Sequence, residues 1–255
     1  MARLDGKTAL VTGASRGIGQ TIAQRLARDG ALVAVHYGRD EAGAKETVTR
    51  ITSAGGRAFA VQAELEAPDA ADTLWVGFDA QLADVQARPG LDVLVNNAGI
   101  SAAAELARIG VEEFDRIFAV NVRAPFFIIQ GSLDRLRDGG RIINISSGAT
   151  RIASPPMVTY AMSKGAVNTL SYTLAKELGA RGITVNAVSP GIVDVESNAA
   201  WLRNDPEQLA LWSSFSAFNR VGQPADIADV VAFVASDEAR WVTGQVLDAT
   251  GGAHL

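Results

Sequence analysis

The chain has 255 residues, of which 48% are hydrophobic and 20% are charged, which suits a single α/β domain with a sizeable core. It has no cysteine, which excludes disulfides and thiolate chemistry, and its two histidines, His36 and His254, stand too far apart to suggest a metal site. The formal charge of −5, without any basic block, argues against a nucleic-acid partner. No apolar run approaches the ~20 residues that span a bilayer and no signal-peptide core follows Met1, so we expect no membrane partner and a cytoplasmic location.

Strands and helices are expected to alternate along the whole chain. Short apolar or β-branched runs predict strands at residues 7–12, 31–36, 57–62, 91–95, 141–146, 183–188 and 245–248. Helical spacing of apolar residues predicts helices at residues 17–29, 41–54, 111–137 and 159–180. This alternation predicts one domain over residues 1–255, with a mostly parallel, seven-stranded, doubly wound sheet and helices on both faces.

One segment, residues 191–223, interrupts this alternation. It mixes Asn, Ser, Trp and Pro with apolar residues before the next helix begins near Pro224. A long irregular segment inside a compact domain is usually functional. We therefore expect residues 191–223 to form a lid over the functional site.

A glycine-rich turn, TGASRGIG at residues 12–19, lies between the first predicted strand and the first predicted helix. Glycines permit a tight turn and a close backbone approach, and the N–H groups at the start of the helix attract a pyrophosphate. Such a turn is weak evidence by itself, because glycines also end ordinary strands. Its position directly after the first strand favours a dinucleotide site.

The charges near the second strand favour a phosphorylated dinucleotide, NADP(H). An NAD site usually carries an acidic residue about 20 positions after the first glycine, whereas this strand continues as Tyr37-Gly38-Arg39, with no carboxylate before Asp40. Arg16 stands where a helix begins, which is unfavourable for a cation unless an anion also binds. Arg16 and Arg39 could together clamp a 2′-phosphate. The alternative is that both are solvated surface arginines.

Tyr160 and Lys164 are spaced i and i+4, so they share one face of a predicted helix. An unperturbed phenol has a pKa near ~10 and is a weak acid at neutral pH, and a nearby cation favours its ionised form. We therefore expect Lys164 to make Tyr160 a better proton donor. The alternative is a partly buried aromatic beside a lysine whose stem covers apolar surface.

Two further positions could contribute polar groups to the same site. The strand at 141–146 leads into Ser146 and Ser147 at the carboxyl edge of the sheet, where ligands of open α/β folds bind. A serine hydroxyl there can hydrogen-bond a substrate oxygen on which negative charge develops. Asn121 is polar within an apolar helical run, and its alternative role is that of a satisfied helix-interior amide.

Across essentially its whole length the sequence resembles a classical short-chain dehydrogenase/reductase, a family with a Rossmann-type fold. The motifs in order are TGASRGIG at 12–19, Asn-Asn-Ala-Gly at 96–99, Ser147, the Tyr160/Lys164 pair and Ser-Pro-Gly at 189–191. The family's serine stands 13 residues before the tyrosine, which selects Ser147 over Ser146. The resemblance implies a catalytic set of Asn121, Ser147, Tyr160 and Lys164, in which Asn121 holds a water that links Lys164 to solvent.

The resemblance also implies where the cofactor binds. It assigns Asn97 and Gly99 to the adenosine side, the segment from Pro190 to Ile192 to the nicotinamide, and Lys164 to the nicotinamide ribose. The full set of expected cofactor-binding residues is Gly13, Ser15, Arg16, Gly17, Ile18, Gly19, Tyr37, Arg39, Glu64, Leu65, Asn97, Ala98, Gly99, Tyr160, Lys164, Pro190, Gly191, Ile192 and Val193. Two positions depart from the family's pattern: Glu64 stands where an Asp usually faces the adenine, and Val195 where a Thr usually bonds the carboxamide, a contact that Ser197 or backbone groups could replace.

The expected activity is NADPH-dependent reduction of a carbonyl. The apolar residues of segment 191–223 suggest a bulky acyl or aromatic substrate, free or carrier-bound, although a core-facing stripe would look similar. The sequence is similar to 3-oxoacyl-carrier-protein reductases and to polyketide ketoreductases, and its arginine-rich, lysine-poor composition leads us to favour the latter. The alternatives are non-redox chemistry, such as dehydration or epimerisation, and a cofactor-binding module without turnover. The resemblance further implies a homotetramer.

Overall fold

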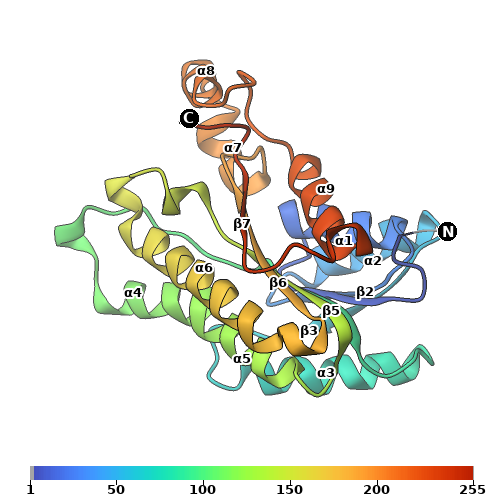
Figure 1. Cartoon of the computed structure of the whole chain (residues 1–255). Coiled ribbons are helices and arrows are strands. Elements are labelled where there is room, and N and C mark those ends of the chain that lie inside the picture. The colour runs from blue at the N-terminus through green and yellow to red at the C-terminus, as the bar shows by residue number, and fades with distance from the viewer. Residues whose placement is uncertain (1–2, 255) are drawn as a thin grey trace.

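The fold is built on one sheet whose strands all run parallel. The computed structural model describes residues 3–254. The strands lie in the order β3-β2-β1-β4-β5-β6-β7, and every neighbouring pair is parallel (Figure 1). The strands are β1 Thr8–Val11, β2 Leu32–Tyr37, β3 Arg57–Gln62, β4 Leu91–Asn96, β5 Leu136–Ile145, β6 Thr184–Pro190 and β7 Val246–Ala249. The prediction of a seven-stranded, doubly wound single domain is confirmed.

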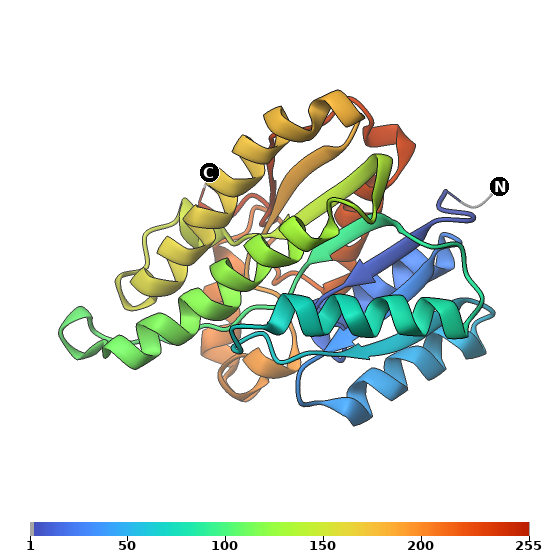
Figure 2. The same ribbon diagram turned by 90° about the horizontal axis from the view of Figure 1, so that it is seen from below.

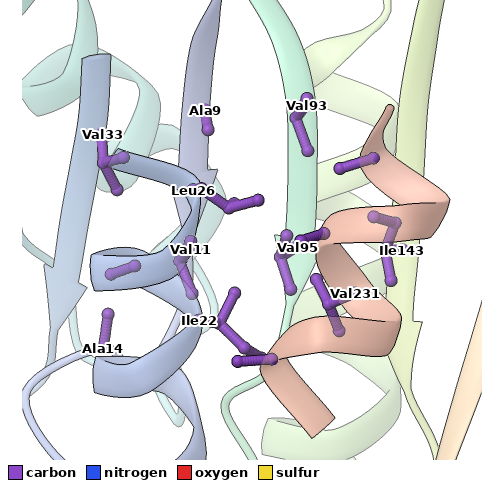
Figure 3. Close-up of a cluster of buried hydrophobic side chains, with 14 of the residues drawn as sticks. Ala9, Val11, Ala14, Ile22, Leu26, Val33, Val93, Val95, Ile143 and Val231 are labelled. Atoms are coloured by element: carbon purple, nitrogen blue, oxygen red, sulfur yellow. The ribbon is translucent and has the colours of Figure 1, made fainter. Parts of the chain in front are cut away.

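Helices cover both faces of this sheet, as the two views show (Figures 1 and 2). One face carries α1 (Gly17–Arg28), α2 (Glu41–Ser53) and α9 (Pro224–Ala235), and the other carries α3 (Ala70–Asp84), α5 (Ala124–Ser132) and α6 (Val158–Leu178). Every residue of β1, β4 and β6 is buried, as expected of strands covered on both sides. Figure 3 shows Ile22 and Leu26 of α1 and Val231 of α9. These side chains pack against Val11, Val95 and Ile143 of the central strands β1, β4 and β5.

The middle of the chain differs from the single helix predicted over residues 111–137. A helix α4 (Val111–Phe118) passes through a π-helical turn (Ala119–Arg123) into α5, which ends at Ser132. The prediction ran too long because β5 begins at Leu136, so Arg137 already belongs to a strand. A π turn shifts backbone pairing by one residue and is frequent at functional sites, and this one contains Asn121.

Two helical regions were missed from the sequence. Helix α3 was not predicted, although its buried side chains at Leu74, Phe78 and Leu82 recur at the spacing of one helix face. The expected irregular lid contains α7 (Glu196–Leu202) and α8 (Pro206–Ser214), so the prediction of an irregular segment is wrong. Asp205 caps α8 by accepting hydrogen bonds from the N–H groups of Glu207 and Gln208, 3.0 and 3.1 Å away. Helices α7 and α8 lie beyond the end of the sheet (Figure 1).

Short 3₁₀ turns complete the described elements, at Leu106–Arg108, Gly148–Thr150, Pro155–Met157, Gly179–Arg181 and Asp237–Ala239. Within residues 3–254, no helix has the length and apolar character needed to cross a membrane.

Candidate active site and cofactor groove

A groove of about 620 Å³ lies at the carboxyl ends of the central strands. Its walls include residues that follow β1, β2, β3 and β4, at the point where the strand order reverses from β1 to β4. Ligands of doubly wound sheets bind at such a switch point. The predicted cofactor residues that line it are Gly13, Ser15, Arg16, Gly17, Ile18, Gly19, Arg39, Glu64, Leu65, Asn97, Ala98 and Gly99.

The glycine-rich turn forms the floor of this groove, and two of its glycines are required by close contacts. A Cβ on Gly13, whose φ is +63°, would lie 2.9 Å from Cα of Ala98. A Cβ on Gly19 would lie 2.3 Å from both Nδ2 of Asn97 and the carbonyl oxygen of Gly13. Nδ2 of Asn97 in turn donates hydrogen bonds to the carbonyl oxygens of Thr12 and Gly13, at 2.9 and 3.1 Å. Asn97 therefore holds the shape of the turn.

The start of helix α1 offers an anion site. No side chain caps its first N–H groups, and its first turn carries no acidic residue. Its N-cap is Arg16, which lines the groove and forms no ion pair with any other described residue. Uncapped N–H groups, the positive end of the helix dipole and a free guanidinium together fit the pyrophosphate and phosphate groups of a dinucleotide.

His36 at the end of β2 connects the glycine-rich turn to the neighbouring strand β3, a role that its position in the sequence did not predict. The N–H of Gly13 donates to Nδ1 of His36 at 3.0 Å, and Nε2 donates to the carbonyl oxygen of Ala63 at 3.0 Å. Burial lowers the pKa of this imidazole to about 4, so it is neutral at pH 7. A polar residue at the end of an otherwise apolar strand was the available signal in the sequence. The described residues contain no cluster of His, Cys, Asp and Glu placed to hold a metal ion.

Arg39 and Glu64, both expected to contact the cofactor, lie together on the groove wall. The carboxylate of Glu64 pairs with the guanidinium of Arg39 at 2.8 Å, and both side chains are exposed. In this structure the partner of Arg39 is thus a protein carboxylate. Tyr37, the other residue expected here, packs against the core beneath the sheet end and does not line the groove.

Ser147 and Tyr160 meet at the carboxyl end of β5. Ser147 follows the strand and caps the short turn at Gly148–Thr150 by accepting from the N–H of Ala149 at 3.2 Å. Tyr160 lies in the first turn of α6, where its phenol oxygen accepts a hydrogen bond from the Ser147 hydroxyl. The serine and the tyrosine thus share a hydrogen bond at the sheet edge where we expected the catalytic site.

Lys164 lies one helical turn after Tyr160, with its ammonium buried. Its Nζ donates to the carbonyl oxygen of Ile145 at 2.7 Å and lies 5.7 Å from the centre of the Tyr160 ring. Burial lowers the pKa of Lys164 to about 8. A Cβ on Gly99 would lie 3.2 Å from Nζ, so Lys164 reaches the wall of the groove.

The expectation that Lys164 acidifies Tyr160 is not supported. Burial raises the pKa of Tyr160 above its ordinary value, and the hydrogen bond from Ser147 offsets this only in part. The ammonium of Lys164 is instead directed at the carbonyl oxygen of Ile145, to which it donates a hydrogen bond. The phenol is therefore a protonated group at neutral pH, which is the state a proton donor needs.

Asn121 uses both ends of its side-chain amide to bond the loop after β4. Its Nδ2 donates to the carbonyl oxygen of Ile100 and to Oγ of Ser163, at 2.9 and 3.0 Å, and its Oδ1 accepts from the N–H of Ile100 at 2.9 Å. Oγ of Ser163 donates to the carbonyl oxygen of Tyr160 at 2.7 Å. Asn121 thus links the cofactor loop to the helix that carries Tyr160.

The loop after β6 brings only some of its expected residues to the groove. Pro190 ends β6, and a Cβ on Gly191 would lie 3.0 Å from backbone atoms of Thr250. Ile192 accepts a backbone hydrogen bond from Gly222, and the side chain of Val193 is buried in the core. The groove wall is formed further along the chain, by Val195, Glu196 and Ser197. Ser197 thus lines the groove close to Val195.

Sequence similarity to known proteins shows which family this chain belongs to. A family model described as enoyl-(acyl carrier protein) reductase matches residues 13–254. The chain is also 39% identical to versicolorin reductase stcU of Emericella nidulans, with 98% of this chain and 97% of the relative covered. The chain belongs to the short-chain dehydrogenase/reductase family. It is accordingly an oxidoreductase, and the family resemblance seen in its motifs is confirmed.

Solved structures of short-chain dehydrogenase/reductases share both fold and sequence with this one. The angucycline C-6 ketoreductase LanV with bound NADP is 51% identical, with a TM-score of 0.93 and with 98% of this chain and 96% of LanV covered. LanV has also been crystallised with NADP and rabelomycin. The promiscuous reductase LugOII, which catalyses a keto-reduction at C1 during lugdunomycin biosynthesis, is 49% identical with a TM-score of 0.95, covering 99% and 100% of the two chains.

Proposed function

We propose that this protein is an NADPH-dependent ketoreductase that acts on a carbonyl of a bulky, polycyclic aromatic polyketide. The observation that carries the proposal is the convergence of the Ser147 hydroxyl, the Tyr160 phenol and the Lys164 ammonium beside the cofactor groove. Bound NADPH supplies the hydride to the carbonyl carbon. Ser147 hydrogen-bonds the carbonyl oxygen, and Tyr160 delivers a proton to it as the negative charge develops.

The proton that Tyr160 loses is replaced through Lys164. With a pKa of about 8 the ammonium is mostly protonated at pH 7 and can release a proton at small cost. Oδ1 of Asn121 accepts one hydrogen bond, from Ile100, and an amide oxygen can accept a second. Oδ1 and Nζ of Lys164 both lie beside Gly99, which supports a role for Asn121 in holding a water that connects Lys164 to solvent. The same groups serve the reverse oxidation.

Two features support NADPH and an apolar substrate. Arg16 and Arg39 give the adenosine end of the groove two guanidinium groups for a 2′-phosphate, and LanV binds NADP. The lid over residues 191–223 exposes large apolar side chains: Trp201, Leu209, Leu211 and Phe218. The names of versicolorin reductase, LanV and LugOII support a polyketide-type substrate. We propose that this protein takes such a substrate either free or bound to a carrier.

The proposal is tested by Tyr160→Phe, with Tyr172→Phe as a matched control, because Tyr172 lies on the same helix with its side chain exposed. NADPH fluorescence titration and turnover of rabelomycin-type ketones are measured for both variants. Tyr160→Phe should keep its affinity for NADPH and lose kcat by about 10³-fold or more, whereas Tyr172→Phe should match the wild type. Near-normal kcat in Tyr160→Phe would refute the assignment. Product formation without loss of NADPH absorbance would indicate non-redox chemistry instead.

We further propose a homotetramer in the cytoplasm, where NADPH is available. Apolar side chains are exposed on α5 and around β7, namely Phe126, Phe127, Trp241 and Val246. Exposed apolar patches of this kind mark contacts between subunits. Sedimentation equilibrium should give four times the chain mass of 26.7 kDa; a monomer would contradict the proposal.

A further inference from the structure

Arg39 and Glu64 occupy equivalent positions on neighbouring strands. In the parallel pair β2 and β3, Tyr37 is in register with Gln62, and these residues end the two strands. Arg39 and Glu64 each stand two residues further on, so the sheet places them side by side at the carboxyl edge. Both line the groove at the end where Arg16 also lies.

The contact between them uses one edge of the guanidinium. Oε2 of Glu64 accepts hydrogen bonds from Nε and NH2 of Arg39, at 3.1 and 2.8 Å. The ion pair raises the pKa of Arg39 and lowers the pKa of Glu64. The charge of Arg39 is thus offset by a carboxylate on the same wall.

The other two carboxylates nearby have different partners. Asp40 caps helix α2 by accepting from the N–H of Gly43 at 3.0 Å. Glu66 pairs with Arg116 at 2.9 Å. Among the described residues, Glu64 is therefore the one carboxylate that hydrogen-bonds Arg39, while Glu66 acts on Arg39 through its charge alone.

We propose that Glu64 is a specificity-determining residue, which holds Arg39 while the groove is empty and which the 2′-phosphate of NADPH displaces. This inference rests on NADPH being the cofactor. It assigns Glu64 to the phosphate end of the groove rather than to the adenine. NADH carries no 2′-phosphate, so it leaves the Arg39–Glu64 pair intact.

The exposure of the pair makes such an exchange possible. The side chains of Arg39 and Glu64 are 70% and 45% exposed, and exposed ion pairs are weak and are screened by salt. A phosphate dianion bonds a guanidinium more strongly than a single carboxylate does, and it is repelled by a carboxylate that remains beside it. Glu64 thus lowers the affinity for NADPH without blocking it.

The experiment compares Glu64→Gln and Glu64→Ala with Glu66→Gln, which removes the same charge from the same wall but has Arg116 as its partner. Dissociation constants for NADPH and NADH are measured by nucleotide fluorescence at low and at moderate salt, and thermal unfolding confirms that each variant is folded. We expect both Glu64 variants to bind NADPH about two- to tenfold more tightly, with NADH unchanged. The gain should shrink as salt is added, and Glu66→Gln should show a smaller gain.

Each of the other results would overturn the inference. Equal weakening of NADPH and NADH would place Glu64 on the adenine. Weaker NADPH binding by Glu64→Ala alone, with Glu64→Gln unchanged, would mean that Glu64 braces Arg39 for the phosphate. No change, or an equal gain in Glu66→Gln, would remove any specific role for the contact. Because the readout is binding, ketone turnover is not needed, so a failure of the proposed reaction is distinguishable from a failure of this inference.

Discussion

Burial of the Lys164 ammonium should make it a source of instability that depends on pH. Its pKa falls from 10.5 to about 8 because the charged form is desolvated. A shift of roughly 2.5 units corresponds to about 3 kcal/mol of unfolding free energy. Between pH 8 and 10.5 the unfolded chain binds the proton and the folded chain does not, so stability should rise with pH through this window. Below pH 8 the full cost is present.

The variant Lys164→Met isolates this contribution, because methionine fills similar space without charge. It also loses the hydrogen bond to Ile145, which costs about 1 kcal/mol. The difference in unfolding free energy, wild type minus variant, should rise by about 3 kcal/mol from pH 7 to pH 10.5. The variant should be at least as stable as the wild type at pH 7, although it is inactive.

Urea unfolding followed by tryptophan fluorescence, at fixed protein concentration and at intervals of pH, measures this difference. Lys176→Met is the control, since Lys176 lies on the same helix and is exposed. Its difference from the wild type should stay small and flat. A Lys164→Met variant that is destabilised by a constant amount at every pH would show that burial does not penalise this ammonium.

Two further predictions concern Ser147, for which we propose a catalytic role, and the buried His36. Ser147→Ala should lower kcat by about 10²- to 10³-fold. The limb of the pH–rate profile due to Tyr160 should also move to higher pH, because the hydrogen bond that lowers the pKa of Tyr160 is lost. A limb that does not move would contradict that contact. For His36, whose pKa falls from 6.5 to about 4, the folded state should lose about 3 kcal/mol as pH drops from 6.5 to 4. His36→Asn should lack this acid loss in urea unfolding, and a wild-type stability that is flat across the window would refute the burial argument.

The elements that the sequence predicted well are those with local signals. Strand β3 matches its prediction at both ends, and α1 begins at Gly17 as expected. The i, i+4 spacing places Tyr160 and Lys164 on one face of α6. The spacing of apolar residues and the residue types that favour turns are properties of short stretches of the chain, so they can be recognised without a structure.

The features that the sequence did not reveal depend on contacts between distant residues. Asn121, in the π turn, bonds to Ile100 and Ser163, and His36 bonds to Gly13 and Ala63, all of them distant in the sequence. The polar residues of segment 191–223 are compatible with loops as well as with the observed helices α7 and α8. Helix formation there depends on packing as well as on helix propensity, so the sequence did not distinguish the two.

The amino-acid sequence by itself determined the family and the doubly wound sheet, and it selected the residues proposed for proton transfer, because repeated periods and ordered motifs are properties of the chain. Only the tertiary structure decided the ionisation and the partners of those residues. Burial raises the pKa of Tyr160 and lowers that of Lys164, and the register of β2 and β3 pairs Arg39 with Glu64. Desolvation and ion pairing depend on what surrounds a group in three dimensions, and spacing along the chain does not record that.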